Sequence, residues 1–186
     1  IGIDGDGTVT VRKTYTTPAD PSEGVVTGIG KLLAAAGATA RDAELVVHGT
    51  TIGTNALLTR NGVKTGLLTT AGFRDVLEIG RVQRPAAGLY DVNVDNPPPL
   101  VPRRHRYEVP ERMGPRGEIR RPLDRDAVAR IATMIAAERI EAVAVVFLHA
   151  YANPAHERET AAILRARLGA EVYITCSSEI LPEIRE

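Results

Sequence analysis

Helix and strand patterns alternate along the second half of the chain, and this alternation constrains the fold more than any other feature. Val128, Ile131 and Ile135 recur at the spacing of one helical face, with Asp124 in the position of an N-cap. The apolar run EAVAVVFLHAYA follows, which is typical of a strand covered on both faces. The helix pattern PAHERETAAILRARLG and the strand pattern EVYITCSS repeat this order. The sequence therefore predicts an α/β fold with a mixed, largely parallel sheet.

The first half of the chain shows the same order with shorter strands. An apolar stripe after Pro21 predicts a helix that ends near Gly37. Leu45–Val47 has the composition of a buried strand, and Asn55–Arg60 has that of a helix. The stretch VKTGLLTTAGFRDVLEIGR then repeats strand and helix once more.

Residues 82–123 interrupt this alternation of strand and helix patterns. The triple proline Pro97–Pro99 favours an extended crossing, and the patterns HRYEVPER and GEIRRPL around the turn MGPRG predict an inserted β-hairpin. Three arginines lie at the start of this hairpin and could bind an anion: Arg103, Arg104 and Arg106. We expect instead a solvated hairpin face on which they pair with three glutamates, Glu108, Glu111 and Glu118.

Composition excludes several classes of protein. Lys plus Arg and Asp plus Glu number 23 each, so no net charge attracts nucleic acid or an anionic membrane. The sequence shows neither an apolar run long enough to span a bilayer nor a leader peptide. Cys176 is the single cysteine, which excludes an internal disulfide, and it shows no metal-ligand spacing with the four histidines. We expect a cytoplasmic protein that binds neither nucleic acid nor membranes.

The opening IGIDGDGT has three possible interpretations. Asp and Gly between short β-prone runs, Ile1–Ile3 and Thr8–Lys13, are a strong signal for a tight hairpin turn. The same residues could form a phosphate-binding loop. They could also be the two ends of a longer motif whose middle is missing, because a first strand of three residues is short even for a sheet edge.

The densest group of polar residues is VVHGTTIGTNALL. His48, Gly49, Thr50 and Thr51 follow a predicted strand and lead directly into a predicted helix. Hydroxyls and unpaired backbone N–H groups would then lie at the carboxyl edge of the sheet, where α/β folds bind ligands and where anions are stabilised. The alternative is structural, with a threonine capping the helix and His48 as a hydrogen-bonded core residue.

Four stretches taken together resemble the amino-terminal region of the hydantoinase A/5-oxoprolinase family, whose relatives include acetone and acetophenone carboxylase subunits. They are VVHGTTIGTNALLTRNGVKTGLLTTAGFRDVLEIGR, PPPLVPRRHRYEVPER, AVVFLHAYANPAHE and SSEILPEIRE. They cover most of the chain in the family's order. The resemblance implies that residues 1–186 form one domain of the actin-like ATPase (ribonuclease H-like) fold and are a fragment of a longer subunit. It also makes the ligand-binding interpretation of His48–Thr51 the favoured one.

The family's chemistry is ATP-dependent opening of a cyclic amide such as hydantoin, 5-oxoproline or another lactam. The resemblance implies ATP and Mg²⁺ as cofactors, with Asp4 acting on the metal or its waters. His48 and Thr50 would be catalytic, with Gly49 and Thr51 beside the phosphates or the carbonyl. Asn55, Arg81 and His149 are weaker candidates for nucleotide or substrate binding. A hydantoinase B-type subunit or domain is the implied partner.

The family pattern also suggests an explanation for the opening residues. Family members begin with a pattern similar to GIDVGGTFTD, followed by a second strand, and only then a strand like VTVRKTYTT. Here IGID would match the first strand and GDGTVTVRK the turn into the third. We therefore expect a mobile glycine-rich phosphate loop and a strand to be missing between Asp4 and Gly5, rather than truly deleted.

Other functions remain open at this point. A ketone carboxylase subunit or a sugar or carboxylate kinase of the same superfamily would share the alternation of strands and helices. A non-catalytic domain that docks a partner subunit is a different class. The sequence does not distinguish among the substrates. We expect these 186 residues alone to lack ATPase activity, because the actin-like fold implied by the resemblance binds nucleotide between two lobes.

Overall fold

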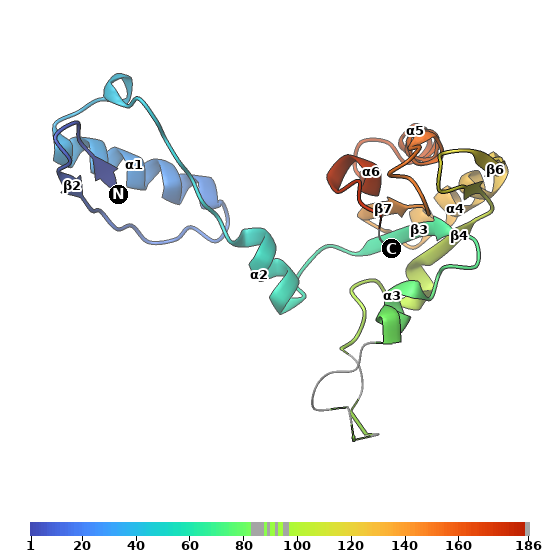
Figure 1. Ribbon diagram of the computed structural model, residues 1–186. Helices are drawn as coiled ribbons and strands as arrows, with labels where there is room; N and C mark the ends of the chain where they lie inside the picture. Colours follow the sequence, from blue (N-terminus) through green and yellow to red (C-terminus); the bar gives the residue numbers. More distant parts are fainter. Residues whose placement is uncertain (83–87, 89, 92, 95–96, 185–186) are drawn as a thin grey trace. The chain divides into compact units, whose positions relative to one another are not determined.

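The computed structural model divides into two units, Ile1–Thr51 and Ile52–Glu186 (Figure 1). It describes residues 1–82, 88, 90–91, 93–94 and 97–184. Among the helices of these residues, none is both long and apolar enough to cross a membrane.

The larger unit is built on a four-stranded parallel sheet. The strands lie in the order β4 (Arg106–Val109), β3 (Thr65–Thr70), β7 (Ala142–Val146) and β8 (Tyr173–Cys176), and each neighbouring pair is parallel. In the register, Leu68 of β3 lies between Tyr107 and Val145. The α/β fold with a largely parallel sheet predicted from the alternation of patterns is therefore confirmed.

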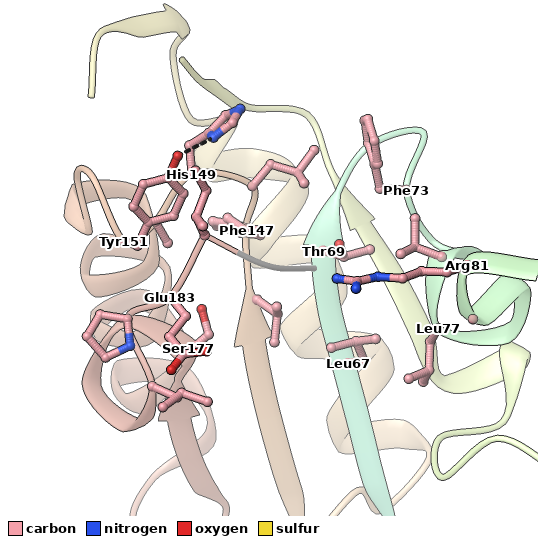
Figure 2. Close-up of a pocket in the computed structure, with 18 residues that line it drawn as sticks. Leu67, Thr69, Phe73, Leu77, Arg81, Phe147, His149, Tyr151, Ser177 and Glu183 are labelled. Atoms are coloured by element: carbon pink, nitrogen blue, oxygen red, sulfur yellow. Dashed lines mark hydrogen bonds between the residues drawn. The ribbon is translucent and has the colours of Figure 1, made fainter. Parts of the chain in front are cut away.

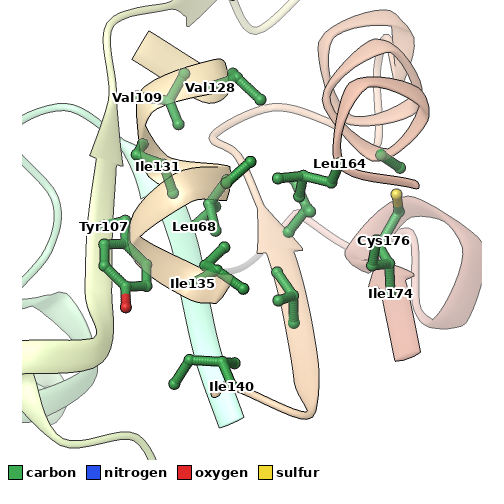
Figure 3. Packing of buried hydrophobic residues seen from close by; sticks show 14 of the residues in the cluster. Leu68, Tyr107, Val109, Val128, Ile131, Ile135, Ile140, Leu164, Ile174 and Cys176 are labelled. Atoms are coloured by element: carbon green, nitrogen blue, oxygen red, sulfur yellow. The ribbon is translucent and has the colours of Figure 1, made fainter. Parts of the chain in front are cut away.

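Helix α4 (Arg125–Ala137) covers one face of this sheet. The predicted N-cap is correct, because the Asp124 carboxylate accepts a hydrogen bond from a backbone N–H of the first turn at 2.8 Å. The predicted stripe of Val128, Ile131 and Ile135 is buried and faces the strand that carries Leu68 (Figure 3). Each such side chain stabilises the fold by about 1.5–3 kcal/mol relative to an exposed one.

Helix α5 (Ala155–Leu168) packs beside α4 and completes the core. Leu164 of α5 is fully buried and lies near Cys176 at the end of β8 (Figure 3). Parallel neighbouring strands need a crossover between them, and α5 is the crossover from β7 to β8. The two helices thus pack against β3, β7 and β8, whose parallel pairing places their carboxyl ends at the same edge of the sheet.

The inserted segment is only partly as predicted. The extended crossing expected after residue 82 lies partly outside the described residues, and its triple proline, Pro97–Pro99, has no regular secondary structure. A short antiparallel hairpin is present, formed by β5 (Arg112–Met113) and β6 (Ile119–Arg121). The pattern HRYEV, expected as one arm of that hairpin, instead joins the main sheet as β4, because Tyr107 and Val109 are buried in the core.

The expected pairing of the arginines with hairpin glutamates is wrong. Arg103 donates two hydrogen bonds to the Asp75 carboxylate, at 2.8 and 3.0 Å. Arg106 is buried, and its Nη1 lies 3.0 Å from Glu78 Oε2. Asp75 and Glu78 belong to the chain that follows β3, so the parallel pairing of β3 with β4 brings them to these arginines. The structure shows no pair between Arg103, Arg104 or Arg106 and the three predicted glutamates, Glu108, Glu111 and Glu118, all of which are described.

The smaller unit contains one long helix. Helix α1 (Pro21–Ala36) has the predicted bounds, with Asp20 as N-cap accepting from Ser22 N–H and Gly37 in the left-handed conformation, φ 66°, as C-cap. A capping box at Thr39 and Asp42 starts the short 3₁₀ helix η1 (Ala40–Asp42) that follows.

The opening of the chain forms a closed hairpin. Strand β1 (Gly2–Ile3) pairs antiparallel with β2 (Val9–Thr10), and Gly7 N–H donates to the Asp4 carbonyl at 2.9 Å. Asp4 and Gly5 are therefore neighbours in a tight turn, contrary to the break that we expected. The tight hairpin turn, the first of the three interpretations of IGIDGDGT, is therefore the correct one. Asp and Gly residues between two short strands favour such a turn.

Two strand predictions in this unit are wrong in extent or burial. Leu45–Val47 has no regular secondary structure and is exposed rather than a buried strand, with Leu45 80% and Val47 83% accessible. Strand β2 covers two residues of the predicted Thr8–Lys13, and Ile3 is 71% exposed. Within residues 1–51, all of which are described, β1 and β2 pair only with each other, so Leu45–Val47 finds no neighbouring strand to bond with.

Candidate functional site

The carboxyl ends of β3, β7 and β8 meet at one edge of the sheet, and a pocket of about 510 Å³ opens there (Figure 2). One wall comes from α3 (Val76–Ile79) and the residues around it, and the other from the segments that follow β7 and β8. The lining is mainly apolar and includes Leu67, Phe73, Leu77, Val146, Phe147, Leu181 and Ile184. Ligands of open parallel sheets bind at this edge, so we call this cavity the carboxyl-edge pocket.

A buried polar network at the end of β3 contacts the pocket through Leu148, one of its lining residues. Thr70, the last residue of β3, donates a hydrogen bond to Glu111 Oε1 and accepts one from Leu148 N–H at 3.1 Å. Glu111 Oε2 lies 2.7 Å from His156 Nδ1, and the residues Glu111 and His156 are 2% and 4% exposed. The network joins the end of β3, the start of the hairpin and the first turn of α5. Buried polar groups satisfied in this way hold one arrangement of the backbone.

A second buried carboxylate anchors the other wall. Glu157 is 1% exposed and accepts four hydrogen bonds: from Phe147 N–H at 2.9 Å, Ser177 Oγ at 2.6 Å, Ser178 N–H at 3.0 Å and Ser178 Oγ at 2.6 Å. These donors belong to the segment after β7 and to α6 (Ser177–Ile180). Phe147 and Ser177 also line the pocket, so Glu157 positions the wall from behind.

The polar side chains of the pocket lie on opposite walls. Arg81 projects from the α3 side toward Thr69, whereas Ser177 and Glu183 lie on the other side (Figure 2). His149 Nδ1 lies 3.3 Å from the Tyr151 hydroxyl, and the two rings meet edge to face, so each restricts the other. The arrangement offers hydrogen-bond donors and both signs of charge around an apolar floor.

Two pocket residues carry an unusual backbone conformation. Arg81 and His149 have positive φ values of 59° and 61°. Arg81 follows the end of α3, as Arg60 and Arg139 follow the ends of helices α2 (Ile52–Thr59) and α4, and a left-handed residue is common at such places. His149 follows a strand instead. Non-glycine residues in this region cost about 1–3 kcal/mol and cluster at functional sites, which supports the carboxyl-edge pocket as the candidate.

A second, more open pocket of about 410 Å³ lies beside β4 and is basic. Its arginines are Arg74, Arg103, Arg104 and Arg106. Carboxylates already neutralise most of this charge, since Arg103 holds the pKa of Asp75 below its usual value by hydrogen bonding, and Glu78 pairs with Arg106. An anion would have to compete with these carboxylates, so this pocket is the weaker candidate.

The structure brings two of the predicted site residues together. Arg81 and His149 both line the carboxyl-edge pocket. Asp4 is exposed in the hairpin turn, and His48–Thr51 is an exposed segment of the smaller unit. Asn55 is exposed on α2 of the larger unit. No group of three potential metal-ligating side chains occurs in the described part of the chain, so Asp4 is not part of a preformed metal cluster.

Sequence reasoning missed Glu157, although the sequence contained a signal for it. Glu157, Ala161 and Leu164 recur at helical spacing and share the buried face of α5. A carboxylate within an apolar stripe has to find hydrogen-bond donors when it is buried. The periodicity therefore places Glu157 in the interior, but only the fold shows which donors surround it.

Comparisons with known proteins agree on one family. The family profile described as "Hydantoinase/oxoprolinase N-terminal region" matches residues 1–168. An uncharacterized protein of Methanocaldococcus jannaschii is 38% identical over 206 residues, covering 100% of this chain and 29% of that protein. The alpha subunit of caprolactamase from Pseudomonas jessenii is 33% identical, covering 98% of this chain and 27% of the relative. A 5-oxoprolinase of Saccharomyces cerevisiae is 31% identical over 74% of this chain and 12% of its own length.

Two solved structures show the same fold. The crystal structure of the ATP-dependent caprolactamase from Pseudomonas jessenii superposes with a TM-score of 0.83 at 33% identity, over 100% of this chain and 27% of that one. A nucleotide-free structure of acetone carboxylase gives a TM-score of 0.80 at 26% identity, over 93% of this chain and 26% of that one. The chain therefore spans about a quarter of the length of these relatives.

Proposed function

Because the chain belongs to the hydantoinase/oxoprolinase N-terminal family, we propose that it forms the N-terminal region of an ATP-dependent enzyme that opens a cyclic amide. The observation that carries this proposal is the similarity to caprolactamase, which extends over the whole chain in both sequence and structure. The carboxyl-edge pocket supports it, since a small, mostly apolar cavity suits a small ring. The actin-like ATPase fold belongs to the same proposal.

The proposed chemistry overcomes the low reactivity of an amide carbonyl. Amide resonance makes the carbonyl carbon a poor electrophile. Transfer of the γ-phosphoryl group of ATP to the carbonyl oxygen fixes the imidate form and leaves a carbon that water can attack. Such a transfer depends mainly on positioning and on donors around the phosphates.

We assign roles in this reaction to the candidate residues of the intact enzyme. His48 and Thr50 would donate hydrogen bonds near the reacting oxygen, with Gly49 and Thr51 beside the phosphates. Asp4 offers one exposed carboxylate, which fits water-mediated contact with a Mg²⁺ ion that takes its other ligands from phosphates and water. Such an ion, when bound, neutralises phosphate charge. Asn55 is a further candidate for nucleotide or substrate contact.

The assembly and location of the protein are part of the proposal. Relatives are named as alpha, beta and gamma subunits of larger enzymes. We propose a hydantoinase B-type partner, which would hydrolyse the activated intermediate, and a cytoplasmic location.

An ATP-dependent ketone carboxylase is the second candidate. The structure of acetone carboxylase superposes with a TM-score of 0.80, against 0.83 for caprolactamase, so the fold comparison supports the two candidates almost equally. The two reactions share activation by ATP and differ in the step that follows. Water attacks the carbonyl carbon of an activated lactam, whereas the α-carbon of an enolised ketone attacks the electrophilic carbon of a carboxylating species.

The test uses the intact gene product, purified with any subunit that copurifies. ATP turnover is measured with caprolactam, 5-oxoproline and hydantoin, and separately with acetone or acetophenone plus bicarbonate. We expect turnover to depend on one of the cyclic amides. Turnover that depends on a ketone plus bicarbonate, or on none of these compounds, would overturn the proposal.

Variants of the same enzyme test the residue roles. His48→Ala and Thr50→Ala should each lower turnover by roughly ten- to a thousandfold, the scale of one lost polar contact to the transition state. Thr133→Ala on the exposed face of α4 is the matched control and should leave turnover unchanged. Near-normal turnover with a lowered melting temperature in the His48 or Thr50 variant would show a purely structural role.

A further inference from the structure

Two opposite charges face the same apolar cavity without neutralising each other. Arg81 and Glu183 both line the carboxyl-edge pocket, and Figure 2 shows them on opposite walls. Neither forms an ion pair with another residue that the structure describes. Between them lie apolar side chains, among them Leu67 and Phe147. The pocket therefore has a cationic side, an anionic side and an apolar middle.

Hydrogen bonds fix the segments that lead to these two exposed side chains. Glu157 accepts hydrogen bonds from Ser177 and Ser178, which precede Glu183 in the chain, and Leu148 N–H donates to Thr70 at the end of β3. The wall that carries Arg81 begins at α3 and turns at Gly80, φ 51°, into the left-handed Arg81. A ligand with one charge would leave the other wall without a partner.

This pattern complements a short hydrocarbon chain with a carboxylate at one end and an ammonium group at the other. Arginine binds carboxylates through two parallel N–H···O bonds, and a glutamate side chain accepts hydrogen bonds from an ammonium group. A neutral lactam carries neither charge. Hydrolysis of the lactam consumes one water, breaks the C–N bond and leaves such a molecule, because the carbonyl carbon becomes a carboxylate and the nitrogen becomes an ammonium group.

We infer that the carboxyl-edge pocket binds an ω-amino acid, the ring-opened form of a lactam, with its carboxylate on Arg81 and its ammonium group on Glu183. The assignment to a reaction product rests on the proposed function, whereas the charge pattern itself does not. The inference makes this pocket a product site, so the ω-amino acid should also inhibit turnover by competing for it.

Calorimetric titration of the intact protein without nucleotide tests this inference. The probes are 6-aminohexanoate, hexanoate and hexylamine, which present both charges, the carboxylate alone and the ammonium group alone. We expect 6-aminohexanoate to bind at least about tenfold more tightly than either single-charge probe, because only it satisfies both walls. Equal affinities for the three probes, or no binding of 6-aminohexanoate at millimolar concentration, would overturn the inference.

Charge-removing variants assign each end of the ligand. Arg81→Gln should weaken hexanoate and 6-aminohexanoate about tenfold and leave hexylamine unchanged, and Glu183→Gln should weaken hexylamine and 6-aminohexanoate instead. Arg167→Gln and Glu171→Gln, at exposed positions outside the pocket, are the matched controls and should change nothing. Identical effects of the two pocket variants on all three probes would refute the assigned orientation.

The same protein samples separate this inference from the proposed function. Lactam-dependent ATP turnover without charge-dependent binding of 6-aminohexanoate would refute the product site alone. Charge-dependent binding without lactam-dependent turnover would refute the proposed reaction and leave a pocket for ω-amino acids of another origin.

Discussion

Replacing Glu157 by glutamine should loosen the wall of the carboxyl-edge pocket by a predictable amount. The Glu157 carboxylate accepts four hydrogen bonds, two on each oxygen. Glutamine keeps one oxygen, which can still serve Phe147 N–H and Ser177. Its NH₂ group then faces Ser178 N–H, a backbone donor left without an acceptor. One unsatisfied buried group costs about 1–3 kcal/mol, and we expect about 2 kcal/mol here.

Hydrogen–deuterium exchange followed by mass spectrometry measures this effect in the intact protein. A loss of about 2 kcal/mol in local stability corresponds to roughly thirtyfold faster exchange, provided that the exchange rate follows the equilibrium between the closed and the locally open state. The acceleration should appear in peptides that contain Phe147 or Ser178. Glu171→Gln, at an exposed position, is the control and should leave exchange unchanged. Unaltered exchange in the Phe147 and Ser178 peptides of Glu157→Gln would refute the role of Glu157 as an anchor.

Three further predictions concern the core and its titratable groups. Burial raises the pKa of the Cys176 thiol to about 11, so a thiol-specific reagent at pH 8 should label Cys176 only after denaturation, and labelling of the native protein would contradict this. Burial lowers the pKa of His105 below its ordinary value of 6.5 despite the nearby Glu138 carboxylate. The unfolded state therefore binds more protons, and the free energy of unfolding should fall as the pH drops below 6.5. A urea midpoint that does not change between pH 7.5 and 5.5, after correction for the change seen in His105→Gln, would contradict this. Ile135 is 0% exposed, so Ile135→Ala should lower the free energy of unfolding by about 2–5 kcal/mol in urea titrations, whereas Met134→Ala, at an exposed position, should change it by less than about 1 kcal/mol; equal effects would refute the predicted packing of α4.

Local patterns in the sequence determined the elements of the larger unit. The stripe of Val128, Ile131 and Ile135 with its cap at Asp124 specified α4 and its buried face, and the run around Val143 specified a central strand. These predictions succeeded because helix and strand periods and capping bonds depend on residues only a few positions apart. Thr70, Glu111 and His156 could not be grouped in this way, since they come from three distant segments of the chain.

Pairing between distant segments was decided only by the tertiary structure. The sequence showed that Leu45–Val47 and HRYEV could both be strands, but HRYEV found a partner in β3 and a place in the core, whereas Leu45–Val47 found neither within its own unit. Arg81 and Glu183 line one cavity for a similar reason. The segments that carry them follow β3 and β8, whose carboxyl ends lie at the same edge of the parallel sheet. A strand becomes stable only when a neighbour satisfies its backbone hydrogen bonds and buries its side chains, and neither condition can be read from a few adjacent residues.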